Sequence, residues 1–316
     1  MLTVGVDAGG TSVRASVVDP HGAVLETTRA PTPDSAPALN AAVADLVGGL
    51  VDRYPVVAVG LAVAGFVSED RRLVRFAPHL AWRHAAVADR LADRLGLPVM
   101  LEHDANAAAF AEQRFGAAAG ARVAVLIALG TGIGSALVLD GEVYRGAYGV
   151  APELGHLRLV PQGRRCPCGK RGCWERYCSG TALADTARQL LSEHPDAATS
   201  LAGQAGSDPS TLTGQRVARA AEEGDPLALE AMGELSRWLG EGLALVSDVY
   251  DPEVVVLAGG VSGSAHLFLD TARQHWASAV TGAGHRPPAH LRLARYGEEA
   301  SMVGAAELAR EHARGR

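Results

Sequence analysis

The sequence VAVLIALGTGIGSALVLD at residues 123–140 decides the fold, because it repeats the pattern of LTVGVDAGGTSVRASVVD at residues 2–19. Each copy has an apolar strand pattern, a turn that contains Gly-Thr, and a second strand pattern. Gly10-Thr11 and Gly130-Thr131 take equivalent places in the two copies. The repetition predicts an internal duplication, and therefore an α/β protein in which two similar domains face a cleft.

Strand and helix patterns continue along the rest of the chain. We predict a small first domain over residues 1–118, a larger second domain over 119–300, and a C-terminal helix at 301–314 that is a candidate to pack on the first domain. The second domain includes a cysteine-rich loop at 153–178 and a helical insertion at 180–250. Further strands are predicted at 23–28, 56–63, 99–102, 254–257 and 291–294, and helices at 36–53, 84–95, 104–115, 226–246 and from about residue 265.

The composition is that of an ordinary globular protein. Of 316 residues, 48% are hydrophobic and 20% are charged, with a formal net charge of -6. The basic residues are scattered, which argues against a nucleic-acid partner, and the apolar runs are too short for a membrane span. Met1-Leu2-Thr3 runs directly into a strand pattern without a secretory leader, so we expect a cytoplasmic location.

All four cysteines lie between residues 166 and 178, downstream of His156. A reducing cytosol disfavours disulfides, so the close spacing of Cys166, Cys168 and Cys173, with Pro and Gly between the thiols, predicts a structural zinc site. The fourth ligand is either His156 or Cys178. We favour His156, because Cys178 follows a Trp-Glu-Arg-Tyr run that predicts a helix start, and Cys178 is then a buried thiol.

Glycine-rich turns supply candidate phosphate sites. Asp7-Ala8-Gly9-Gly10-Thr11 combines a carboxylate, two glycines and a hydroxyl, which suits phosphate with Mg²⁺. The alternative is an ordinary hairpin turn with glycine at positive φ. Thr131 and Gly132 lie in the second such turn, and the two turns together can hold a triphosphate. Gly259-Gly260 follows a strand pattern and precedes a helix, where backbone N–H groups bind phosphorylated ligands.

Three carboxylates are candidates for chemistry or for binding. Asp104 stands where a strand pattern meets a helix, which is either the place of an N-cap or that of a base that accepts a hydroxyl proton. Glu153 and Glu175 flank the cysteine-rich loop. They are either surface charges or acceptors for the vicinal hydroxyls of a polyol.

Taken together, these motifs resemble the ROK family of sugar kinases and repressors over essentially the whole chain. The motifs that carry the resemblance are Asp7-x-Gly9-Gly10-Thr11, Asp104-Ala105-Asn106, Leu129-Gly130-Thr131-Gly132, Glu153-Leu154-Gly155-His156, Cys166-x-Cys168-Gly169-x-x-Gly172-Cys173-x-Glu175 and Ala258-Gly259-Gly260. The resemblance implies an actin-like pair of ribonuclease H-like domains around a cleft, and Mg-ATP-dependent phosphorylation of a hexose. It also implies a homodimer or homotetramer.

The resemblance further implies roles for individual residues. Asp104 matches the general base for the sugar 6-hydroxyl. The residues that match sugar contacts are Gly65, Glu153, His156 and Glu175, with one ring nitrogen of His156 on zinc and the other facing the sugar. The residues that match the phosphate and nucleotide contacts are Asp7, Gly9, Gly10, Thr11, Thr131, Gly132, Gly259 and Gly260.

Two positions depart from the pattern of the family. His103 and His79 stand where glucokinases of this family usually carry Asn, and an imidazole offers its donor and acceptor at a different geometry from an amide. We therefore expect either glucose or a gluco-configured hexose altered at C3 or C4, such as kanosamine, as the substrate. An N-acetylhexosamine kinase and a noncatalytic sugar-sensing protein are the alternatives. The repressors place a DNA-binding domain before the first glycine turn, whereas Asp7 stands near the start of this chain, so we favour a kinase.

Overall fold

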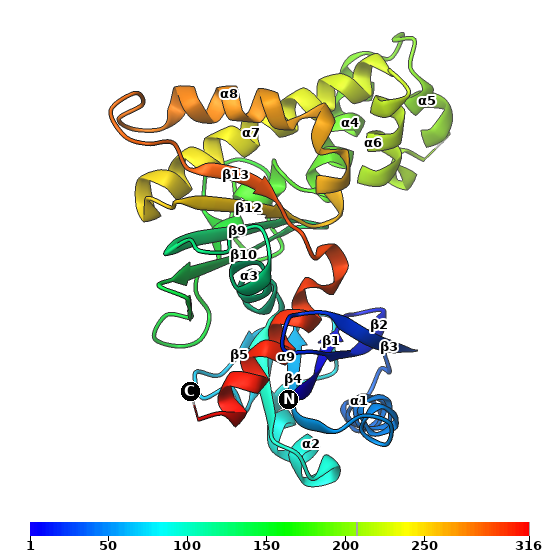
Figure 1. Cartoon of the computed structure of the whole chain (residues 1–316). Coiled ribbons are helices and arrows are strands. Elements are labelled where there is room, and N and C mark those ends of the chain that lie inside the picture. Colours follow the sequence, from blue (N-terminus) through cyan, green and yellow to red (C-terminus); the bar gives the residue numbers. More distant parts are fainter. Residues whose placement is uncertain (207, 316) are drawn as a thin grey trace. The chain divides into compact units, whose positions relative to one another are not determined.

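The computed structural model describes residues 1–206 and 208–315. Its first sheet has the strand order β3-β2-β1-β4-β8 (Figure 1). Its first three strands pair antiparallel in chain order, whereas β4 pairs parallel to both β1 and β8. The bounds are β1 (Leu2–Ala8), β2 (Ser12–Val18), β3 (Val24–Pro31), β4 (Val56–Val63) and β8 (Val99–His103).

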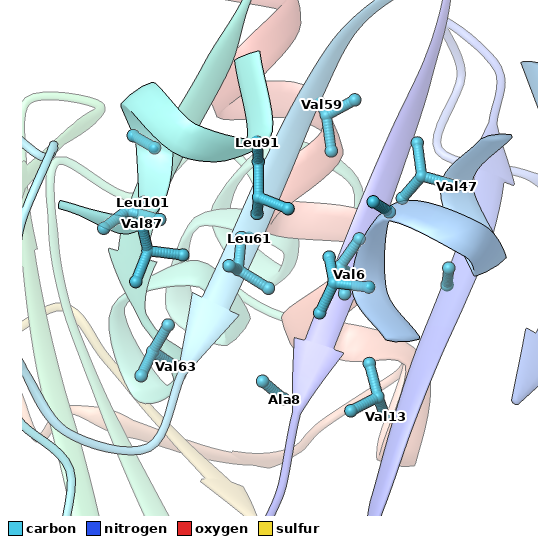
Figure 2. Packing of buried hydrophobic residues seen from close by; sticks show 14 of the residues in the cluster. Val6, Ala8, Val13, Val47, Val59, Leu61, Val63, Val87, Leu91 and Leu101 are labelled. Carbon is cyan, nitrogen blue, oxygen red and sulfur yellow. The ribbon is translucent and has the colours of Figure 1, made fainter. Parts of the chain in front are cut away.

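One face of this sheet is covered by α1 (Ala36–Val51) and α2 (Val87–Leu95). Figure 2 shows Val6 and Leu61 of the strands packing with Val47 of α1 and Leu91 of α2, all of them buried. Fully burying an aliphatic side chain stabilises the fold by about 1.5–3 kcal/mol, so this layer accounts for much of the stability of the sheet.

The other face packs against α9 (Ala300–Ala313), which in turn contacts α3 (Asp104–Phe115). The contact is close because glycines stand where the backbones meet. A Cβ added to Gly5 or to Gly60 would run into the backbone of Met302 or Ala305 in α9, and one added to Gly304 would meet Ala107. The C-terminal helix therefore packs on the sheet that begins at the N-terminus.

A small antiparallel sheet follows β4 and consists of β5 (Phe66–Val67), β6 (Val74–Phe76) and β7 (Arg83–Ala85). The helix predicted at residues 84–95 is shorter than expected, since residue 84 lies in β7 and α2 begins at Val87. His84 has φ of 46°, a backbone conformation that cannot belong to a right-handed helix.

The second sheet repeats the order of the first, as β11-β10-β9-β12-β13. Its bounds are β9 (Val123–Leu129), β10 (Ile133–Leu139), β11 (Glu142–Tyr144), β12 (Val254–Ala258) and β13 (His290–Leu293). As in the first sheet, the hairpin strands β10 and β11 are antiparallel and the last two strands are parallel. The predicted duplication and the α/β fold class are thus confirmed.

Helices occupy most of residues 180–250, between β11 and β12. They are α4 (Gly180–Glu193), α5 (Ser200–Ala205), α6 (Gly214–Glu222) and α7 (Pro226–Tyr250), with short 3₁₀ turns at Leu154–His156, Trp174–Arg176 and Pro209–Thr211. α8 (Leu269–Ala279) packs along α7 (Figure 1). The helix predicted from about residue 265 is α8, which starts later than expected because a 3₁₀ segment, Gly260–Leu267, precedes it.

The chain divides into two compact units. Unit 1 comprises Met1–Leu126, Ala136–Pro152 and Ala294–Arg316, and unit 2 comprises Ile127–Ser135 and Glu153–Leu293. The division therefore runs through β9 and β10, after the boundary predicted at residue 118. Among the described residues, no helix combines the length and the apolar character that crossing a bilayer requires.

Candidate functional site

The first glycine turn connects β1 to β2 and carries Asp7 at its edge. Asp7 lies directly opposite Arg14 in the hairpin register, and Arg14 Nη2 donates to Asp7 Oδ2 at 2.8 Å. A carboxylate beside a turn of exposed backbone is suited to Mg²⁺ that arrives with a phosphate ligand, directly or through water.

Asp7 and Asp104 both lie in unit 1, and the charge of Asp104 acts on the pKa of Asp7. Burial raises the pKa of Asp7, the Arg14 guanidinium opposes that rise, and the carboxylate of Asp104 adds to it. The structure thus brings the two predicted acidic residues to the same edge of the first sheet, at the ends of β1 and β8. Parallel strands end at a common edge, which is where ligands bind in open α/β sheets.

The glycines of the two turns are not explained by hairpin geometry. Neither Gly10 nor Gly132 has a positive φ, so a left-handed backbone conformation does not explain glycine at either position. A Cβ on Gly10 would instead lie 2.9 Å from the Cβ of His79. A Cβ on Gly65 would lie 2.7 Å from the Cα of Ala77, two residues before His79. The structure therefore gathers Gly10, Gly65 and His79, all predicted site residues, in one part of unit 1.

Asp104 is the first residue of α3, and His103 occupies the N-cap position. The interpretation of Asp104 as the N-cap is therefore wrong, and its carboxylate is available for other work. Asp104 Oδ1 accepts from the Ala105 N–H at 2.8 Å and lies 3.2 Å from His103 Nε2. Asp104 therefore stands at the N-terminus of α3, where the helix dipole is positive, and this is a suitable place for a carboxylate that acts as a general base.

Four predicted ligands meet in unit 2 and can hold a metal ion. One ligand atom from each of His156, Cys166, Cys168 and Cys173 lies within 4.8 Å of the other three. The Sγ atoms of Cys168 and Cys173 are 3.6 Å apart, and Cys166 Sγ is 3.7 Å from His156 Nδ1. A tetrahedral zinc ion with Zn–S bonds of about 2.3 Å separates its ligand atoms by about 3.8 Å, so the set fits zinc.

The loop that carries these ligands is anchored on both sides. Trp174 is fully buried, its indole Nε1 donates to the Trp238 carbonyl at 2.8 Å, and its ring fills the space that a side chain at Gly242 of α7 would occupy. Lys170 Nζ donates to the His156 carbonyl at 2.9 Å. Cys178 stands apart from the cluster as a fully buried thiol whose pKa is raised by burial, as predicted.

Glu175 joins the metal cluster to the second glycine turn. Its Oε1 lies 3.1 Å from Cys166 Sγ and 3.6 Å from His156 Nδ1. Its Oε2 faces the turn, where a Cβ on Gly132 would lie only 2.5 Å away. Glu175 is therefore held between the cluster and the turn and is not a free surface charge.

Glu153 directly precedes the 3₁₀ turn Leu154–His156. The next residue, Leu154, donates its N–H to Ser135 Oγ of β10 at 3.0 Å, and a Cβ on Gly155 would lie 2.6 Å from the Ile133 carbonyl. The Glu153-Leu154-Gly155-His156 segment is thus fitted closely against the start of β10, within unit 2.

A profile of the ROK family matches residues 3–312. The chain belongs to the ROK family. The glucokinase of Streptomyces coelicolor is 41% identical over 310 residues, which cover 98% of each chain. A solved ROK glucokinase from Streptomyces griseus, in complex with glucose and AMPPNP, is 42% identical with a TM-score of 0.86, over 98% of this chain and 100% of that one. The xylose repressor of Bacillus subtilis is 26% identical and is covered over only 69% of its own length.

Membership of the ROK family confirms the actin-like fold class expected for the two sheets. The structure also adds features that the motifs alone missed. The N-terminus of α4 reaches the second turn, where the Gly180 N–H donates to the Gly130 carbonyl at 2.8 Å, so a helix dipole points at a predicted phosphate turn. Arg14 beside Asp7 was missed as well, although the hairpin pattern could have indicated a partner seven residues away.

The third glycine site agrees with the predicted turn after β12. Gly259 has φ of 85°, and its position against the Leu129 carbonyl leaves no room for a side chain. Gly260 begins the 3₁₀ segment and has open space around its Cα. An exposed backbone of this kind lets a ligand approach the main chain closely.

Proposed function

We propose that this protein transfers the γ-phosphoryl group of ATP to the 6-hydroxyl of glucose. The protein is a phosphotransferase with an alcohol acceptor, and the observation that carries the proposal is its match along 98% of the chain to a glucokinase. The repressors of the family share less identity, and a solved relative that holds glucose and AMPPNP has the same fold.

In the proposed reaction, Asp104 accepts the proton of the sugar 6-hydroxyl as the bond to phosphorus forms. His103 and His79 contact the sugar on the same unit, and Gly65 borders it through its backbone. The turn at Gly9, Gly10 and Thr11 binds the phosphates, with Asp7 facing the Mg²⁺ that accompanies ATP. Phosphoryl transfer depends mainly on positioning and electrostatic stabilisation, which such a set of groups supplies.

Residues of unit 2 have proposed roles as well. We propose that Glu153, Glu175 and the Nε2 atom of His156 bind sugar hydroxyls, while His156 Nδ1 and the three thiolates hold zinc. Zinc there supplies structure and no chemistry, because it orders the loop and fixes the tautomer and orientation of His156. Thr131, Gly132, Gly259 and Gly260 would contact the nucleotide. The protein is further expected to be a homodimer or homotetramer, which light scattering would measure.

A narrower version of the proposal concerns the two histidines. The imidazoles of His103 and His79 replace the amides that usually read the C3 and C4 hydroxyls, and this change favours a hexose altered there, such as kanosamine. Glucose and kanosamine therefore compete as the preferred substrate, ahead of N-acetylhexosamines.

A coupled assay for ADP release tests the proposal, with ATP and a panel of glucose, kanosamine, mannose, glucosamine, N-acetylglucosamine and N-acetylmannosamine. The expected result is turnover of glucose, of kanosamine, or of both. The kinase proposal would be rejected by the absence of sugar-dependent ADP release on the whole panel. A higher kcat/KM for an N-acetylhexosamine would reject the assignment of the sugar.

A further inference from the structure

Glu102 is a buried carboxylate next to the proposed base, and the proposed mechanism leaves it without a role. It lies near the end of β8 with 2% of its surface exposed. Its Oε1 accepts from the His103 backbone N–H at 2.9 Å and from Asn106 Nδ2 at 3.0 Å. Its Oε2 accepts from Arg145 Nε at 2.7 Å and lies 2.5 Å from Arg145 Nη2. Four donors therefore surround one carboxylate and satisfy its hydrogen-bonding capacity inside the protein.

Hydrogen bonds to neighbouring residues of its own segment also hold Arg145 in place. Its Nη1 donates to the Val143 carbonyl at 3.0 Å, and its backbone carbonyl accepts from the Ala151 N–H at 3.1 Å. Both residues lie in unit 1, although they are 43 positions apart in the chain. The Arg145 guanidinium thus reaches β8 from the segment after β11 with its side chain already oriented.

The hydrogen bonds of Glu102 act on the start of α3. His103 makes no side-chain capping hydrogen bond among the described residues, so the usual N-cap interaction is missing. Glu102 instead contacts this start from the preceding strand, because it accepts from the N–H of the N-cap residue and from the side chain of Asn106 in the first helical turn. A carboxylate at this position also complements the helix dipole. The orientation of the peptide that joins Glu102 to His103, directly before Asp104, therefore depends on Glu102.

We propose that Glu102 and Arg145 form a buried positioning pair that holds the His103–Asp104 junction in the geometry required for sugar phosphorylation. Neither residue touches the substrate in this scheme. Glu102 fixes the backbone from which Asp104 projects, and Arg145 fixes Glu102. The role rests on the proposed kinase function, because it assigns Asp104 as the base.

The test compares Glu102→Ala with a matched control, Glu112→Ala. Glu112 is also a buried carboxylate of the α3 region, but it lies at the other end of the helix, where it accepts from the N–H groups of Ala117, Arg295 and Tyr296. Both variants lose a saturated buried carboxylate, and both are expected to lower the melting temperature. Only Glu102→Ala should lower kcat with glucose, by about 10- to 100-fold, because small misplacements of a catalytic group cost this much.

A second readout does not depend on activity. Hydrogen exchange at the His103 amide, followed by NMR, should be about tenfold faster or more in Glu102→Ala and unchanged in Glu112→Ala, because its acceptor is lost only in the first variant. If the wild-type protein phosphorylates no hexose, the kinase proposal fails, and the exchange rate still decides whether Glu102 holds the junction.

The proposal is overturned if folded Glu102→Ala keeps a kcat within twofold of Glu112→Ala, or if exchange at His103 is unchanged. Should Glu102→Ala fail to fold, Arg145→Lys decides in its place. That variant keeps the charge but loses the two-point contact, and its kcat should fall about tenfold with the KM for ATP little changed. A kcat equal to that of wild type would reject the pair.

Discussion

Substituting Gly132 by Ala should weaken sugar binding by displacing Glu175. The added Cβ would lie 2.5 Å from Glu175 Oε2, which falls about 0.9 Å short of the 3.4 Å at which ordinary van der Waals contact begins. Gly132 does not have a positive φ, so its backbone tolerates Ala, and the contact must be relieved by movement of the carboxylate. That movement is resisted, because Glu175 Oε1 is in contact with Cys166 and His156.

The expected loss follows from one hydrogen bond. A hydrogen bond to a charged group contributes about 1.5–3 kcal/mol, so the loss of one sugar hydroxyl from Glu175 should raise the Kd for glucose about 10- to 100-fold. Isothermal titration calorimetry without nucleotide measures this directly. Gly130→Ala is the matched control, since its Cβ would have no atom within 4 Å and its φ is not positive. That control should bind glucose as tightly as wild type.

A double-mutant cycle gives the decisive comparison. If Gly132→Ala acts by moving Glu175, combining it with Glu175→Ala should weaken binding no further than Glu175→Ala alone. Fully additive losses, or a wild-type affinity in Gly132→Ala, would refute the reasoning. Zinc content should be measured in each variant, so that loss of the metal is not mistaken for displacement of the carboxylate.

Three further outcomes follow from the same geometry. Asp104→Asn keeps the Oδ1 acceptor for the Ala105 N–H but cannot take a proton. We therefore expect kcat to fall about 10²- to 10⁴-fold, while glucose binding measured by calorimetry persists. Near-normal turnover would exclude Asp104 as the base. Chelation or Cys168→Ser should release zinc, which elemental analysis would detect. The loop should then lose its order, and the Kd for glucose should rise. An unchanged Kd in the metal-free protein would contradict this. His103→Asn should raise the ratio of kcat/KM for glucose over that for kanosamine, and an equal ratio before and after would remove His103 from substrate selection.

Local sequence patterns were enough to predict most of the elements and the kinds of chemistry. Strands, helices and turns follow local alternation and glycine placement, so the duplicated strand-turn-strand unit at residues 2–19 and 123–140 could be recognised without a structure. The ligand set at His156 and in the Cys166–Cys173 segment was readable for the same reason, since most of its spacing is short-range. The errors in the predicted elements concerned their boundaries, such as the start of α2 at Val87.

Only the tertiary structure decided what the glycines and buried charges do. Gly10 and Gly132 were expected to be needed for φ or for approach to a ligand, yet each also stands against a side chain that the chain brings back from far away, His79 and Glu175 respectively. The pairing of Glu102 with Arg145 is of the same kind. Such contacts depend on how sheets and helices pack, and packing is set by the sum of many weak interactions between distant segments, which no short pattern records.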